Sequence, residues 1–186
     1  EKAPTPPPSE TLLNTLRSRK LTNCTLMAVG DDARTAVEAA AAAPDVIKVL
    51  VLVDLTPPED VASTAEKDAD SAWKATLSKL TAPTLALYRA DLMLGVGSAG
   101  QYLKATGLDA AERVRVRRVD SEAPILKTAA ASVAAKINTF LDDVREGRDI
   151  APETRQKTDS GLSYIDQIVG EGASPKAGQT VAARFR

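Results

Sequence analysis

Histidine is absent from this sequence, and cysteine and aromatic residues are scarce. With no histidine among its 186 residues, the chain by itself holds no Ser-His-Asp triad, no Cys-His dyad and no histidine-ligated metal site. Aromatic residues make up 3% of the chain, so a core must be built mainly from Ala, Val, Leu and Ile. The one cysteine, Cys24, lies in an apolar run, where we expect a buried, unreactive thiol. We therefore expect neither a metal site nor a cofactor.

Charge of one sign and long apolar runs are also missing. The net charge of -1 gives no reason to expect nucleic acid or an acidic membrane surface as a partner. The longest apolar stretch, residues 46–53, contains Lys48 and is far shorter than the ~20 residues of a transmembrane helix. Because 44% of the residues are hydrophobic, the chain can bury a core. These features predict a globular protein of a soluble compartment with no transmembrane segment.

Four short apolar segments alternate with helical patterns. We expect strands at residues 24–29, 47–54, 83–88 and 114–119. The second segment, IKVLVLVD, is nearly continuous and β-branched, as is typical of a parallel strand buried on both faces. Arginine alternates through the last segment, VRVRRV, which favours a strand at a sheet edge. The pattern predicts an α/β fold with a small parallel sheet and helices on both faces.

Composition changes divide the chain into four parts. Residues 1–8 are a proline-rich lead-in, and residues 9–147 hold the α/β domain, which ends in one long helical pattern over residues 124–146. Residues 148–160 are polar and charged and are predicted to be a linker. Residues 161–186 are a C-terminal β segment with Gly/Pro turns, and two strands alone are marginally stable.

The stretch 157–186, KTDSGLSYIDQIVGEGASPKAGQTVAARFR, resembles the start of an FKBP-type peptidyl-prolyl isomerase domain. The family's opening has the form SGLxYxDxxxGxGxxPxxGxxV. Ten residues match it: Ser160, Gly161, Leu162, Tyr164, Asp166, Gly170, Gly172, Pro175, Gly178 and Val181.

This resemblance implies a β segment that supplies one wall of the isomerase pocket. That wall is Phe185, where the family has tyrosine, and the rest of the pocket is expected beyond residue 186. The style of the opening also implies a plastid, and the thylakoid lumen in particular.

The α/β part resembles the middle of an α/β-hydrolase. The run LMAVGDDARTAVEAAAAAPDVIKVLVLVD has that family's order of strand, elbow, helix and strand. The resemblance places Asp32 at the position of the elbow serine and Arg34 at the second glycine. It places Asp91 near the acid of the triad and Glu122 where the histidine would be.

Asp32 has two interpretations. It is a nucleophile if the chain resembles the haloalkane dehalogenases, whose mechanism also uses a histidine that this chain lacks. Alternatively, Asp32 caps the following helix by accepting a hydrogen bond from a backbone N–H. With catalytic positions filled by Asp32, Asp91 and Glu122, we interpret the domain as a degenerate, pseudo-hydrolase-like domain.

The leading functional hypothesis is a non-catalytic, FKBP-related binding or scaffold subunit of a larger assembly with protein partners. The first alternative is an FKBP-type prolyl isomerase or folding factor whose catalytic half lies beyond residue 186. The second alternative is an α/β-hydrolase-type enzyme with Asp32 as its nucleophile.

Overall fold

The computed structural model describes residues 6–55, 64–89, 98–121, 125–148, 150, 156–157 and 163–164. The chain divides into two compact units, Glu1–Glu153 and Thr154–Arg186. The division falls inside the predicted linker, while the predicted limits of the individual domains stay a prediction. Among the described residues, no helix has the length and apolar character needed to cross a membrane.

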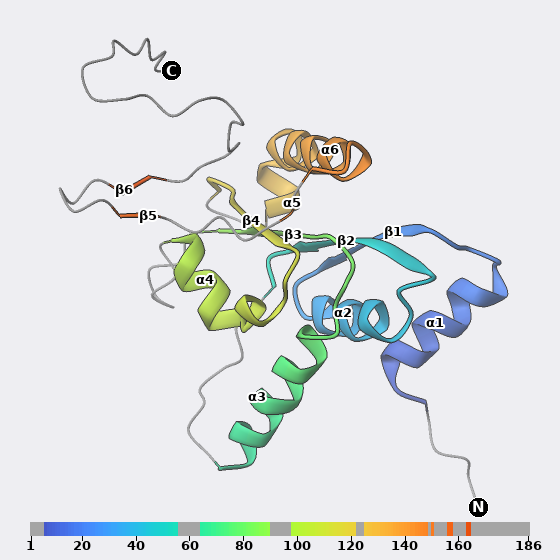
Figure 1. Ribbon diagram of the computed structural model, residues 1–186. Helices are drawn as coiled ribbons and strands as arrows, with labels where there is room; N and C mark the ends of the chain where they lie inside the picture. The colour runs from blue at the N-terminus through green and yellow to red at the C-terminus, as the bar shows by residue number, and fades with distance from the viewer. Residues whose placement is uncertain are drawn as a thin grey trace, which may run out of the picture. The chain divides into compact units, whose positions relative to one another are not determined.

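Four parallel strands form the sheet of the larger unit (Figure 1). They lie in the order β1-β2-β3-β4, with bounds β1 (Cys24–Val29), β2 (Ile47–Val53), β3 (Thr84–Tyr88) and β4 (Val114–Arg118). In the register, Val51 of β2 lies between Met27 and Leu85, and Leu85 pairs with Arg115. The predicted α/β fold with a small parallel sheet is confirmed, and β4 lies at an edge of the sheet as expected.

Helices cover both faces of this sheet, as predicted (Figure 1). One face carries α1 (Pro8–Ser18), α2 (Asp32–Ala42), α3 (Thr64–Leu77) and α4 (Ala99–Thr106), which is followed by the short 3-10 helix η1 (Leu108–Ala110). The other face carries α5 (Ile125–Thr128) and α6 (Ala130–Arg145). Because the strand order always advances by one, crossovers of the same hand place α2, α3 and α4 on the same face.

Strand β2 explains why two cores form. Its side chains alternate between the faces, so Leu50 and Leu52 belong to the core beneath α1–α4. Val51 and Val53 belong to the core beneath α5 and α6, where Phe140 is also buried. This central strand is buried on both sides, which is why its sequence reads as a nearly continuous apolar run.

The sequence predicts one long helix over residues 124–146, but the structure has two helices there, α5 and α6. Ala129 leaves the helical conformation, with φ -129° and ψ 28°, and separates α5 from α6. The hydroxyls of Ser121 and Thr128 are in contact, and Ile125 is fully buried, so α5 is tied to the segment that follows β4. These local contacts break the helix at a point that the hydrophobic periodicity does not reveal.

In the second unit, β5 (Gln156–Lys157) pairs antiparallel with β6 (Ser163–Tyr164). β5 lies in the segment predicted to be a linker, and β6 lies in a segment predicted to be a strand. Phe185 lies outside the described residues.

Candidate functional site

The carboxyl ends of the four strands bring polar residues together. In a parallel sheet these ends meet at one edge, which is where open α/β sheets bind their ligands. Asp31 and Asp32 follow β1, Asp54 follows β2, Arg89 follows β3 and Asp120 follows β4. The carboxyl-end edge of the sheet is therefore the candidate functional site.

Asp54 sits in an uncommon backbone conformation at this edge. Its φ of 57° is left-handed, and its backbone N–H donates to the carbonyl of Leu87 at 2.8 Å. A non-glycine residue held in this region costs about 1–3 kcal/mol, and such residues gather at functional sites. Aspartate tolerates the conformation better than most residues do. The turn directs the chain out of β2 while the β2–β3 hydrogen bonding continues through Asp54.

Arg89 contacts the carboxylate of Asp54 from the end of the neighbouring strand. Its Nε lies 3.5 Å from Oδ1 and 3.4 Å from Oδ2 of Asp54. These are long contacts compared with the 2.7–3.2 Å of a usual N–H···O hydrogen bond. The side chains are 31% and 30% exposed, so solvent reaches both groups. Among the described residues, the contact with Asp54 is made by Nε, and the two Nη groups of Arg89 are further donors suited to a second anionic group.

A buried pair of tyrosines lies next to Asp54. The rings of Tyr88 and Tyr102 stack with centroids 4.6 Å apart, and the Tyr102 hydroxyl donates to the carbonyl of Leu55 at 3.0 Å. Burial raises the pKa of Tyr102 well above its ordinary value, and the negative charge of Asp54 raises it further. A capping box between Ser98 and Gln101 fixes the start of α4, which carries Tyr102. The tyrosine is therefore a neutral hydrogen-bond donor in a fixed position.

The raised pKa of Tyr102 makes stability fall at alkaline pH. The unfolded chain loses the tyrosine proton near pH 10, whereas the folded chain retains it to higher pH. Above about pH 10 the unfolded state thus binds fewer protons, and the stabilisation from Tyr102 decreases as pH rises. We expect the difference in unfolding free energy between the unmutated chain and Tyr102→Phe to shrink from pH 8 to pH 11, as measured by urea denaturation. A difference that is constant over this range would contradict the assignment.

The turn after β1 does not have the geometry expected of a nucleophile elbow. Its left-handed residue is Gly30, with φ 57°, whereas Asp31 has ordinary right-handed helical angles. Asp32 is the exposed first residue of α2, beyond the residue that would carry the strain of an elbow. The N-cap residue of this helix is Asp31 and not Asp32, and Asp31 makes no side-chain cap hydrogen bond. A carboxylate in the first turn still favours the helix dipole.

Arg34, which the resemblance places at the second glycine of an elbow, contacts a residue of helix α3. Its guanidinium lies 4.9 Å from the centre of the Trp73 ring on α3. Trp73 in turn donates its Nε1 hydrogen to the carbonyl of Thr106 at 2.8 Å. Arg34 therefore takes part in packing between α2 and α3.

Asp91 and Glu122 lie outside the described residues, so their predicted roles stay predictions. Within the described part of the chain, no group of three potential metal-ligating side chains is present. Asp54, Arg89 and Tyr102 are not among the site residues predicted from the sequence. A signal for the first two was available, because each directly follows an apolar strand segment.

Comparisons with known proteins identify the fold. No protein-family model matches the chain, and no curated protein matches it. Two solved structures are similar. E-2-(acetamidomethylene)succinate hydrolase has a TM-score of 0.52 at 15% identity, over 72% of each chain. A predicted CIB-like hydrolase from Thermoplasma acidophilum has a TM-score of 0.54 at 12% identity, over 72% of this chain and 57% of that one.

These findings correct the predicted family. The assignment to the FKBP-type prolyl isomerases is wrong, because the matching structures are hydrolases and no family model supports it. The FKBP-related scaffold function is wrong with it, and the plastid location loses its support. The match at the C-terminus rests on spaced Gly, Pro and Ser residues, which are common to many turns. The chain has a small parallel-sheet fold like that of α/β-hydrolases.

Proposed function

We propose that this chain has an α/β-hydrolase-type function, with its working site at the carboxyl ends of β2 and β3. The observation that supports this most strongly is the Asp54–Arg89 pair. Asp54 is in a left-handed conformation, the two side chains come from adjacent strand ends, and both remain partly open to solvent. Backbone strain at Asp54, a pair of opposite charges and access for solvent therefore occur together at the carboxyl ends of β2 and β3.

The proposed reaction is hydrolysis of an acyl compound without histidine. Asp54 accepts a proton from water while the water oxygen attacks the acyl carbon. The bond from that carbon to the leaving oxygen or nitrogen breaks, and the proton passes to the leaving group. An aspartate in this role is consistent with a sequence that has no histidine to act as the base.

The proposed substrate is a small acyl compound that carries a carboxylate. The Nη groups of Arg89 provide donors suited to a planar oxyanion, and Arg binds carboxylates with two parallel hydrogen bonds. One structural neighbour is named as a hydrolase of an acetamido derivative of succinate, which is a substrate of this kind. At 15% identity that neighbour supports the fold, and the substrate class here rests on Arg89.

We expect Asp54→Asn to lower turnover of carboxylate-bearing esters and amides by about 100-fold or more, since a positioned base contributes ~10²–10⁴-fold. The measurement is the initial hydrolysis rate of the purified chain on a panel of such compounds. Asp45→Asn is the matched control, because Asp45 is exposed and precedes β2 at the opposite end of the strand. It should leave the rate unchanged.

Two further variants test substrate binding by Arg89 and the alternative nucleophile Asp32. Arg89→Met should raise KM more for substrates with a carboxylate than for their neutral methyl esters. Asp32→Asn should have little effect if Asp54 is the base, and should abolish turnover if Asp32 is the nucleophile. No hydrolysis by the unmutated chain over the whole panel would reject the proposed function.

A further inference from the structure

Strand β1 lies at the opposite edge of the sheet from β4 (Figure 1). Among the described residues, its only neighbour in the sheet is β2. An edge strand presents unpaired backbone N–H and C=O groups, and proteins usually protect such an edge with charged side chains or proline. The sequence of β1, CTLMAV, contains neither. The β1 edge is therefore suited to pairing with another strand.

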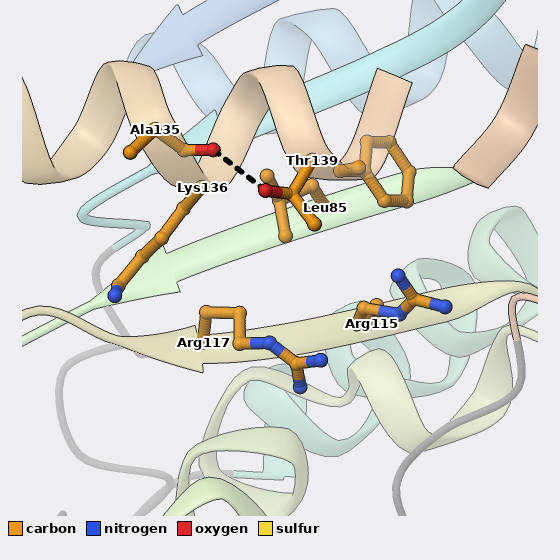
Figure 2. Close-up of a pocket in the computed structure, with 7 residues that line it drawn as sticks. Leu85, Arg115, Arg117, Ala135, Lys136 and Thr139 are labelled. Atoms are coloured by element: carbon orange, nitrogen blue, oxygen red, sulfur yellow. Dashed lines mark hydrogen bonds between the residues drawn. The ribbon is translucent and has the colours of Figure 1, made fainter. Parts of the chain in front are cut away.

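The β4 edge differs, because it carries charge and lies under a helix. The sequence of β4, VRVRR, contains three arginines. Figure 2 shows Arg115 and Arg117 spaced along this strand. Helix α6 lies over the sheet beside them, and its residues Lys136 and Thr139 line a small pocket together with β4. Of the two edges, β1 is thus the one without protection against strand pairing.

The β1–β2 hydrogen bonds show which residues of β1 face the open edge. The N–H of Cys24 donates to the carbonyl of Val46 at 2.8 Å. At the other end of the strand, the N–H of Gly30 donates to the carbonyl of Val53 at 2.9 Å. Because backbone groups alternate in direction along a strand, the even-numbered residues of β1 bond to β2. The residues whose N–H and C=O groups point to the open edge are Thr25, Met27 and Val29.

The side chains of these three residues are also exposed. Met27 is 51% and Val29 is 41% exposed, and Thr25 is exposed as well. Met27 pairs in register with Val51, which is buried in the core beneath α5 and α6. The helices of this face therefore cover β2 but leave the outer strand uncovered. An apolar strip along β1 is open to solvent next to the unpaired backbone groups.

The charges at the two ends of β1 have opposite signs. Exposed Arg17, Arg19 and Lys20 precede the strand, and exposed Asp31 and Asp32 follow it. If two copies of β1 pair antiparallel, the basic start of each strand lies near the acidic end of the other. A parallel pair would instead bring like charges together, which is unfavourable. This charge distribution favours a second copy of the chain as the occupant of the edge, in antiparallel orientation.

We propose that two copies of this chain pair antiparallel through β1 about a two-fold axis, which joins their four-stranded sheets into one continuous sheet. The axis passes at Met27, so that Met27 faces Met27 of the second copy and Thr25 faces Val29. This register pairs all three outward-facing residues with one another. Both copies use the same surface, as a two-fold interface requires. The pairing also removes the apolar side chains of Met27 and Val29 from water.

Analytical ultracentrifugation of the full chain from about 1 to about 100 µM tests the dimer. We expect a reversible equilibrium between monomer and dimer. Met27→Lys should raise the dimer dissociation constant at least about tenfold, because the two-fold axis places two like charges directly opposite each other. Leu126→Lys is the matched control, since Leu126 is also an exposed apolar residue, 38% exposed, but lies on α5. It should leave the dissociation constant unchanged.

Oxidative cross-linking tests the register of the two strands. Facing Cα atoms of a hydrogen-bonded antiparallel pair lie about 5.5 Å apart, within the ~4.4–6.8 Å that a disulfide spans. In a Cys24→Ser background, Met27→Cys should therefore form a cross-linked dimer. Val29→Cys is the control, because it faces Thr25 and is displaced from its own counterpart by about 13 Å along the strand. It should not form the cross-link.

The proposal fails if the unmutated chain stays monomeric over this concentration range, or if it forms assemblies larger than a dimer. It also fails if Leu126→Lys weakens association as much as Met27→Lys does. Cross-linking of Val29→Cys as readily as of Met27→Cys would reject the register. Melting temperatures show whether each variant is folded. If Met27→Lys lowers the melting temperature, the comparison of the two cysteine variants decides.

Discussion

We expect Asp143→Asn to lower the free energy of unfolding by about 3–5 kcal/mol, the usual result of removing one partner from a buried ion pair. Asp143 lies on α6 with only 9% of its side chain exposed. It contacts Arg115 of β4, which is 12% exposed, and accepts a hydrogen bond from Arg148 at 2.8 Å. The asparagine would remove the buried carboxylate charge that both Arg115 and Arg148 contact.

The adjacent Asp142 provides a matched control. Asp142 pairs with Arg145 at 2.7 Å, but these side chains are 58% and 76% exposed. Exposed pairs of this kind contribute about 0–1 kcal/mol, so Asp142→Asn should change stability little. Urea denaturation of both variants measures the difference. Equal effects of the two substitutions would contradict a structural role for the Arg115–Asp143 contact.

Trp73→Ala should also be strongly destabilising, by about 3–5 kcal/mol, because it empties a large buried volume. Trp73 is 6% exposed and packs in the core beneath α1–α4. The substitution also leaves the carbonyl of Thr106 without its donor. Gly107 lies so close that a Cβ there would come within 3.3 Å of the Trp73 ring, which shows how tightly the ring is enclosed.

Arg34→Ala is the comparison for Trp73. Arg34 is exposed, and its cation–π contact over the ring is worth about 0.5–1 kcal/mol. Circular dichroism during urea unfolding is the appropriate measurement, because Trp73 is the one tryptophan and its removal abolishes that fluorescence signal. A loss for Trp73→Ala no larger than that for Arg34→Ala would show that the residue is not part of the core.

The layers of the fold could be predicted from the sequence because they depend on local patterns. The run IKVLVLV fixes β2 as a strand buried on both faces, and the four strand segments alternate with helical patterns. The break at Ala129 could not be predicted in this way, since it depends on contacts with the segment after β4.

Contacts between residues far apart in the sequence could not be predicted from the local sequence patterns. Asp54 and Arg89 meet only because β2 and β3 are neighbours in the sheet, which spacing along the chain does not reveal. Asp142 and Asp143 are identical neighbours in the sequence, yet Asp142 is exposed whereas Asp143 is buried against Arg115 of β4. The FKBP assignment was wrong for a related reason. The spacing of glycine and proline indicates turns, which many folds share, and does not indicate the tertiary contacts around those turns.

The most direct test of the central claim is a single-turnover hydrolysis in ¹⁸O-labelled water with a carboxylate-bearing ester. If Asp54 acts as a base on water, the acid product should contain one solvent oxygen in the first turnover, and Asp54→Asn should lose the reaction. If the first product instead carries unlabelled oxygen taken from a protein carboxylate, the reaction is covalent and Asp54 is not the base. An unmutated chain that forms no product would contradict the α/β-hydrolase-type function itself.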